Sequence, residues 1–218
     1  MGRRSDHSRE ELRELALRAA EKVVERDGLR ELSARQVARK IGYAVGTLYN
    51  LFEDFDDLVI QVNARTLDAL HQDLTQELER ARGQGAVLAL ALRYSIFVVN
   101  HSKRWNALFE HSLPAGRELP PWYQEKIQRL LGILAAALAP YFPSGREAQR
   151  DQAAQLLWAS VHGICSLASA DKLPSQGQTA TMVRDLVETY LRGLDGAAPR
   201  GPRRLRAPVP QAIVPPSK

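Results

Sequence analysis

Residues 33–52 read SARQVARKIGYAVGTLYNLF, and this stretch decides the fold class. Val37 and Ile41 stand four residues apart, as do Leu48 and Phe52, so each half of the stretch has one apolar helical edge. Two short helices that share a core and are separated by a glycine-centred turn form the pattern of a helix-turn-helix DNA-binding unit. The stretch therefore predicts two short α-helices that read DNA.

Both ends of the first short helix are marked in the sequence. The Ser33 hydroxyl can cap its start by accepting one of the backbone N–H groups that the first turn leaves unpaired. Gly42 stands where this helix must stop. A longer amphipathic helix is predicted before this pair, over residues 8–26, and it completes a three-helix unit.

One face of the second short helix is expected to meet DNA. With Leu48 and Phe52 in the core, the opposite face is centred on Gly46 and Asn50 at about 100° per residue. Hydroxyl and amide groups on that face can donate to phosphates, and an asparagine can also pair with an adenine edge. The expected DNA-contacting residues are Ser33, Arg35, Val45, Gly46, Thr47, Tyr49 and Asn50.

Two alternatives remain open for these residues. Tyr49 can pack beside Phe52 instead of facing DNA, and Arg35 and Arg39 can belong to a solvated helix face. A pair of helices joined by a short turn is a common motif, so the spacing alone does not decide between these readings.

The segment 32–58, LSARQVARKIGYAVGTLYNLFEDFDDL, closely resembles the N-terminal DNA-binding domain of the tetracycline-repressor (TetR) family. Gly46-Thr47-Leu48-Tyr49 and Phe52 match the family's recognition helix. The resemblance implies an all-helical homodimer, in which the N-terminal domain binds a palindrome of double-stranded DNA and a larger C-terminal domain binds a small effector.

Two positions depart from the pattern of the resembled family. Leu51 stands where the family usually has a histidine, and Phe55 stands where it usually has a phosphate-contacting lysine. Four acidic residues between 53 and 57 also lie near the expected phosphate path. Weaker or more salt-sensitive DNA binding than in relatives with both contacts is therefore expected, or help from Arg3, Arg4 and Arg9.

The rest of the chain is predicted to be helical as well. Glu53 and Asp54 open a longer helix, and helical patterns follow at 85–111, 120–140, 146–170 and 177–194, with no convincing strand pattern. The expected architecture is all-α: a helix-turn-helix DNA-binding domain at 1–60, and an effector-binding and dimerisation domain at 61–195. Residues 196–218 hold six prolines and are expected to form a disordered tail.

The net charge of +5 belongs to that tail. Its five basic residues have no acidic counterpart, so residues 1–195 carry equal numbers of basic and acidic side chains. DNA affinity must therefore come from a local face or from the tail. No apolar run is long enough to cross a bilayer, and no signal peptide follows Arg3 and Arg4. The single cysteine, Cys165, fits a reducing cytoplasm, where the protein is expected to act without a membrane partner.

Residues 157–167, LWASVHGICSL, resemble the Trp-His-Gly motif of one class of TetR-family C-terminal domain. The matching residues are Trp158, His162 and Gly163, and the first two share a helical face. Either this edge borders the effector cavity, or it is core and dimer packing. The candidate pocket residues are Trp105, Phe109, Trp122, Trp158 and His162, with Tyr123 beside them and His101 and His111 as further donors or surface residues.

The sequence thus predicts a DNA-binding transcriptional regulator, most simply a homodimeric repressor that an unidentified small molecule releases. No cofactor or metal is expected, because His162 and Cys165 have no second ligand cluster. Stripes of apolar and small residues on the last two helices can supply the dimer interface. The alternatives are a DNA-organising protein without a ligand and, third, a helical enzyme that uses His162 with a distant carboxylate.

Overall fold

The computed structural model describes residues 7–81, 83–170, 172–173 and 178–195. Within these ranges helices are the only regular secondary structure and no strand occurs, which confirms the all-α prediction. The N-terminal arginines Arg3 and Arg4 and the predicted tail 196–218 lie outside the described residues. The helices are α1 (Arg9–Asp27), α2 (Ala34–Ile41), α3 (Val45–Leu51), α4 (Phe55–Arg80), α5 (Ala86–Asn100), α6 (Ser102–Glu110), α7 (Pro121–Leu138), α8 (Glu147–Ser169) and α9 (Thr179–Asp195), with short 3₁₀ turns at Leu29–Glu31, Gly83–Gly85 and Ala139–Tyr141.

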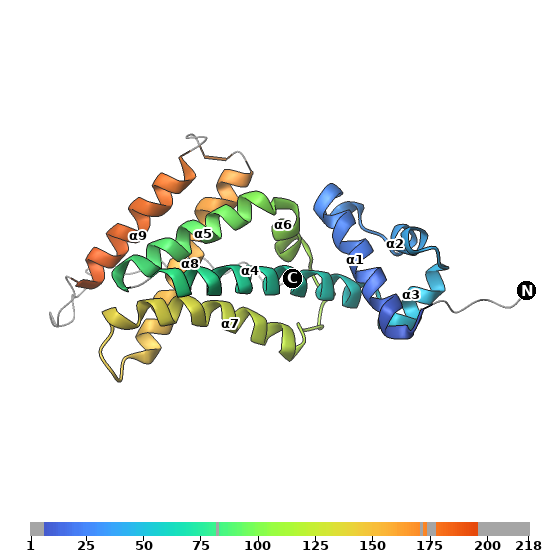
Figure 1. The fold of residues 1–218 in the computed structure, drawn as a ribbon, viewed down its shortest axis with the longest axis horizontal. Helices are drawn as coiled ribbons and strands as arrows, with labels where there is room; N and C mark the ends of the chain where they lie inside the picture. The colour runs from blue at the N-terminus through green and yellow to red at the C-terminus, as the bar shows by residue number, and fades with distance from the viewer. Residues whose placement is uncertain (1–6, 82, 171, 174–177, 196–218) are drawn as a thin grey trace, which may run out of the picture.

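The first three helices pack around their own small core. Ala16 and Val23 of α1 are fully buried, and they share this core with Val37 of α2 and Leu48 of α3. Figure 1 shows these three helices as a separate group at one end of the molecule. The apolar edges expected from the sequence therefore meet in one core.

The start of α2 and the turn between α2 and α3 both have the predicted capping residues. The Ser33 hydroxyl accepts a hydrogen bond from the backbone N–H of Gln36 at 3.3 Å, and so caps α2. Gly42 ends α2 with φ of +77°, a left-handed conformation that side chains disfavour and glycine tolerates. This turn sets the direction in which α3 leaves α2.

The longest helix, α4, connects the two parts of the molecule. Its first two turns contribute Leu58, Val59 and Val62 to the N-terminal core, whereas Leu70 and Leu74 belong to the C-terminal core. Figure 1 shows α4 running through the middle, from the helix-turn-helix unit to the bundle formed by α5, α7, α8 and α9. The domain boundary expected at residue 60 falls inside this helix.

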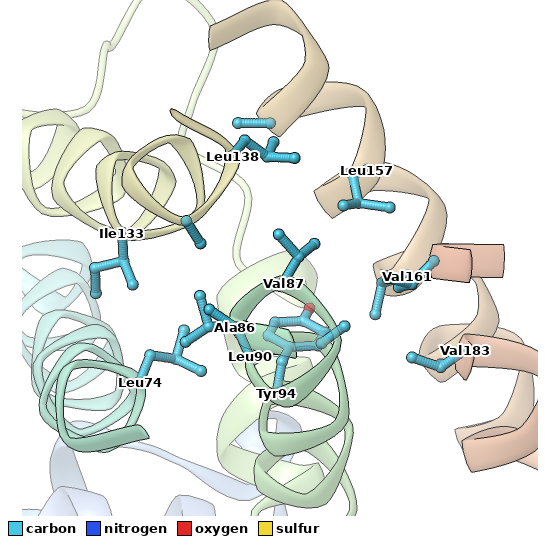
Figure 2. Close-up of a cluster of buried hydrophobic side chains, with 14 of the residues drawn as sticks. Leu74, Ala86, Val87, Leu90, Tyr94, Ile133, Leu138, Leu157, Val161 and Val183 are labelled. Carbon is cyan, nitrogen blue, oxygen red and sulfur yellow. The ribbon is translucent and has the colours of Figure 1, made fainter. Parts of the chain in front are cut away.

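The C-terminal core is built around α5. Figure 2 shows Val87, Leu90 and Tyr94 of α5 surrounded by Leu138 of α7 and Leu157 of α8, with side chains of α4 and α9 completing the ring. These side chains are almost completely shielded from water. Among the described residues, no helix combines the length and the apolarity that a membrane crossing requires.

The helix predicted at 85–111 is two helices in the structure. His101 has φ of −123° and ψ of 32°, which interrupts the helical backbone between α5 and α6. The break turns α6 towards α1 and α4, so Ala107 is buried in the N-terminal core, while Trp105 is buried in the C-terminal core against Tyr94 of α5. The continuous apolar pattern of this stretch hid the break, because periodicity does not register a change of direction.

Candidate functional site

The exposed face of α3 is the one that the sequence predicts for DNA contact. Tyr49 is 54% exposed, and Gly46 and Asn50 are exposed as well, whereas Leu48 is buried against α1 and α2. The structure therefore does not place Tyr49 in the core beside Phe52. Its phenol stands free to donate to a phosphate.

The remaining residues of the expected set lie around this face. Arg35 is exposed in the first turn of α2, and Thr47 is half-buried. Val45, the first residue of α3, is half-buried and packs against the N-terminal core. Ser33 acts through its cap on α2. Four of the seven residues thus lie on α3 outside its buried edge, Arg35 is exposed on the neighbouring α2, and Ser33 and Val45 hold the helices.

The two departures from the family pattern are explained by packing. Leu51 is only 6% exposed and lies in the N-terminal core, and Phe55, the first residue of α4, packs against the same core. Both side chains are therefore apolar groups directed inward. Neither offers a hydrogen bond to a phosphate.

Two arginines of α1 hold the end of α3. Arg9 donates from Nη2 to the carbonyl oxygen of Asn50 at 3.0 Å, and Arg13 donates from Nη1 to the carbonyl oxygen of Leu51 at 2.7 Å. Carbonyl groups at the end of a helix lack partners within the helix, and positive charge is favourable there. Arg9, which the sequence suggested as a helper in DNA binding, is in this structure a cap of α3.

Two of the four acidic residues after α3, Asp54 and Asp56, have close basic partners within the chain. Asp54 caps α4 by accepting from the Asp57 backbone N–H at 2.8 Å, and its carboxylate also pairs with Arg117. The backbone hydrogen bond and then the guanidinium lower the pKa of Asp54. Asp56 pairs with His111, from Nε2 to Oδ1 at 2.9 Å. The segment between α6 and α7 therefore supplies charge partners beside the DNA-facing unit.

A cavity of about 420 Å³ lies between α4, α6, α7 and α8. This volume is within the range of roughly 300–1,000 Å³ that is typical of small-molecule sites. Aromatic and aliphatic side chains form most of its wall, including Leu67, Trp105, Phe109, Tyr123, Leu130 and Trp158. His111 and Arg117 lie at its border, so the same two residues that pair with the start of α4 also line the cavity.

The pocket residues predicted from the sequence divide into three groups. Trp105, Phe109 and Trp158 line the cavity. His162 lies behind them, with its ring stacked on Trp158 at 5.5 Å between centroids and 4.4 Å from the ring of Phe109. Trp122 lies elsewhere, in a more polar cleft of about 740 Å³ between α1, α3, α4 and α7.

The surroundings of His162 favour the uncharged form of its imidazole. Its Nδ1 forms a hydrogen bond of 2.9 Å with the Tyr94 hydroxyl, and burial lowers the pKa of the imidazole while it raises the pKa of Tyr94. Burial also raises the pKa of the Cys165 thiol, whose Sγ contacts the Ser95 hydroxyl at 3.5 Å. In the part of the chain that the structure describes, no three His, Cys, Asp or Glu side chains are grouped as metal ligands would be.

Sequence reasoning missed the aliphatic lining and two polar lining residues. Asn63 is buried inside the apolar face of α4, and Arg117 comes from the loop between α6 and α7. Asn63 could have been identified from the sequence, because a polar residue within an apolar helical stripe is unusual. No such signal existed for Arg117, because only the tertiary fold places that loop beside both the cavity and α4.

The chain matches two family models along much of its length. Residues 16–62 match the model described as "Bacterial regulatory proteins, tetR family". Residues 87–190 match the model described as "Tetracyclin repressor-like, C-terminal domain". The second match contains Trp158, His162 and Gly163. No curated protein matches the chain.

Several solved structures share the fold at low sequence identity. A protein of unknown function from Rhodococcus sp. RHA1 has a TM-score of 0.70 and 22% identity, over 88% of this chain and 98% of that chain. A TetR transcriptional regulator from the same organism has a TM-score of 0.62 and 19% identity, over 84% and 98%. RolR in complex with the ligand resorcinol has a TM-score of 0.60 and 16% identity, over 85% and 88%.

A helix-turn-helix unit on one long helix, followed by a helical domain, defines a class of DNA-binding regulators. The chain belongs to the TetR family, and it is a DNA-binding transcriptional regulator.

Proposed function

We propose that the protein is a repressor that binds a palindromic operator as a homodimer in the cytoplasm and that a small molecule in the cavity releases it. The observation that carries the DNA-binding side is the exposed face of α3, where Tyr49 and Asn50 are open to solvent while Leu48 on the other side anchors the helix. One such helix reads only a few base pairs, so two copies about one DNA turn apart give useful specificity.

An exposed apolar stripe on α8 supports the proposal of a homodimer. Leu156 and Leu167 are about half exposed, and their separation of eleven residues places them on one face of the helix. Ser160 and Gly163 lie between them on that face. A Cβ atom added to Gly163 would meet nothing within 4 Å, so there is open space at this point of the stripe in the protomer. An apolar stripe with small residues in its middle suits close packing against a second copy.

The contacts of the segment from His111 to Pro120 support the proposed coupling between effector binding and DNA binding. His111 and Arg117 border the cavity, and both pair with acidic residues in the first turn of α4 or at its cap. A ligand that changes the position of this segment also changes the position of α4 relative to α3. Release then follows from a difference in ligand affinity between the DNA-bound and released forms. The complex of RolR with resorcinol, a protein of the same fold, supports a small-molecule effector.

The test is a selection of bound fragments from the source genome, followed by footprinting. A few palindromic sites beside genes, protected by two copies of the chain, support the proposal. Hundreds of unrelated sites indicate a DNA organiser instead, and no sites contradict a regulatory role. A reporter gene placed after a selected site separates repression from activation, because deletion of the regulator raises expression only if it represses.

A further inference from the structure

Two polar groups of cavity-lining residues, one on Asn63 and one on Tyr123, form no hydrogen bond within the described residues, and the indole Nε1 of Trp105 is buried there without a partner. Asn63 is 2% exposed and donates from Nδ2 to the carbonyl oxygen of Ala107 at 3.2 Å, which identifies its other terminal atom as the oxygen Oδ1. Within the described residues, neither Asn63 Oδ1 nor the hydroxyl of Tyr123 has a hydrogen bond, although Tyr123 is only 5% exposed. Asn63 Oδ1 and the Tyr123 hydroxyl are not fully buried atoms, so both reach the space of the cavity, where a bound molecule or water can pair with them.

These two groups come from different walls of the cavity. Asn63 belongs to α4 and Tyr123 to α7, and both residues line the same space. Asn63 Oδ1 can only accept a hydrogen bond, whereas the Tyr123 hydroxyl can donate and accept. A hydroxyl group meets both needs, because it has one proton to donate and lone pairs to accept.

The walls around these groups favour an aromatic ring. Trp105 and Trp158 line the cavity together with Phe109, and their rings already pack edge to face or stacked on neighbouring rings. Aromatic side chains attract further aromatic groups through offset and edge-to-face contacts. The remaining lining is aliphatic, so a flat ring system fits the space in shape and in polarity.

The charges at the border of the cavity argue against an ionic ligand. Arg117 pairs with Asp54 and Asp56, and His111 pairs with Asp56. The other lining residues are uncharged. An anion that enters the cavity loses its hydration without finding an unpaired cation, and this loss is costly. Burial raises the pKa of Tyr123 to about 12, so its hydroxyl keeps its proton at neutral pH.

We propose that the cavity binds an uncharged, hydroxylated aromatic molecule, with its hydroxyl group held by Asn63 and Tyr123 and its rings between Trp105, Phe109 and Trp158. This proposal rests on the proposed role of the cavity as the effector site, and it names the class of that effector. The hydroxyl group is the feature that distinguishes this ligand from any other apolar molecule of the same size.

Three naphthalenes of nearly equal size test the proposal: 2-naphthol, 2-methylnaphthalene and 2-naphthoate. Dissociation constants are measured on the full chain without DNA, from the fluorescence of the cavity tryptophans. We expect 2-naphthol to bind at least about tenfold more tightly than either of the others, although 2-methylnaphthalene is the most hydrophobic. Equal or tighter binding of the hydrocarbon or the carboxylate overturns the proposal, as does the absence of binding by all three.

Two variants locate the hydroxyl group. Tyr123→Phe keeps the ring and removes the hydroxyl, and Asn63→Leu removes the acceptor; each should reduce the preference for 2-naphthol over 2-methylnaphthalene at least about fivefold. Tyr190→Phe, which removes a hydroxyl of α9 outside the cavity, should leave the preference unchanged. If Asn63→Leu fails to fold because Ala107 loses its donor, Tyr123→Phe alone decides. An unchanged preference in a folded Tyr123→Phe variant contradicts the proposal.

The same compounds separate this proposal from the proposed function. If 2-naphthol binds with the expected preference but leaves the operator complex intact, the ligand chemistry stands and the effector role fails. If 2-methylnaphthalene releases the operator as well as 2-naphthol does, the effector role stands and the hydroxyl requirement fails.

Discussion

The guanidinium of Arg117 pairs with the carboxylate of Asp54, the residue that caps α4 directly after the helix-turn-helix unit. Arg117 also borders the cavity, so a single side chain contacts both the start of α4 and the ligand space. Both partners are partly exposed, and an ion pair of this kind contributes little to stability. The ion pair matters instead because it connects the start of α4 with the wall of the cavity.

Arg117→Gln should weaken the coupling between effector and DNA. The variant loses the charge that holds the segment between α6 and α7 to Asp54, so the effector should change DNA affinity about fivefold less than in the wild type. DNA affinity is measured by fluorescence anisotropy with and without effector. Arg93→Gln is the matched control, because it removes a similar ion pair with Asp73 far from the DNA-binding unit. Equal coupling in the two variants would contradict the prediction.

Tyr49→Phe and Asn50→Ala should each weaken operator binding about fivefold, which corresponds to about 1 kcal/mol for one lost hydrogen bond. Both side chains are exposed, so the free energy of unfolding should change by no more than about 0.5 kcal/mol. Anisotropy titrations and urea denaturation measure the two quantities. Gln76→Ala, at an exposed position of α4, is the control that should alter neither.

Leu51→His should destabilise the protein instead of adding a phosphate contact. Leu51 lies in the N-terminal core, so a buried imidazole there loses apolar packing and hydration, at a cost of about 2–4 kcal/mol. Urea denaturation measures the loss, and Leu51→Met should cost less than about 1.5 kcal/mol. A stable Leu51→His variant with tighter DNA binding would show that this position can turn outward.

Stability should fall in acid because of His162. Burial holds the pKa of this imidazole below its usual value of 6.5, so the unfolded chain binds the proton more readily than the folded chain does. The contribution of His162 is therefore complete above about pH 6.5 and is lost progressively as the pH falls towards the lowered pKa of the folded state.

His162→Gln removes this titration and should flatten the dependence of the unfolding free energy on pH below about 6.5. His71, whose pKa burial also lowers, contributes in the same direction, so the slope should not vanish. Denaturant titrations between about pH 5 and pH 7.5 measure both chains. A slope equal to that of the wild type would mean that His162 does not titrate differently on folding.

Leu156→Arg should convert the proposed dimer into a monomer. The side chain is 56% exposed in the protomer, so the substitution leaves the fold intact, but it places a charge at one end of the apolar stripe. Sedimentation velocity measures the mass, and operator affinity should fall with it. Gln155→Arg, the exposed neighbour that lies off this stripe, is the matched control. A Leu156→Arg dimer would place the interface elsewhere.

Local spacing was sufficient to predict most helices and the exposed face of α3. Val37 and Leu48 are buried as their periodicity indicates, and Gly42 ends α2 in the conformation that glycine favours. Helical periodicity and caps are short-range properties, and residues within one turn determine them. The break at His101 escaped prediction, because it depends on how α6 packs against α1 and α4.

The cavity was only partly predictable. The aromatic residues Trp105, Phe109 and Trp158 are identifiable by type, but Trp122 and Tyr123 are adjacent in sequence and only Tyr123 lines the cavity. Neighbouring residues on a helix point about 100° apart, and the sequence does not say which one faces the interior. Asn63 and Arg117 reach the site through contacts between distant segments.

The length of α4 determines how far a small change at the cavity displaces the end of the helix next to the DNA-binding unit. A helix of 26 residues is about 39 Å long at 1.5 Å per residue. If its far half stays fixed in the bundle, a tilt of about 5° displaces the free end, about 20 Å away, by about 1.7 Å. In a two-fold dimer both ends move, so the separation of the two α3 helices changes by up to about 3.4 Å, about a tenth of the roughly 34 Å between successive major grooves. A helix of this length therefore allows a small ligand of about a dozen atoms to change the spacing of the two α3 helices along the DNA.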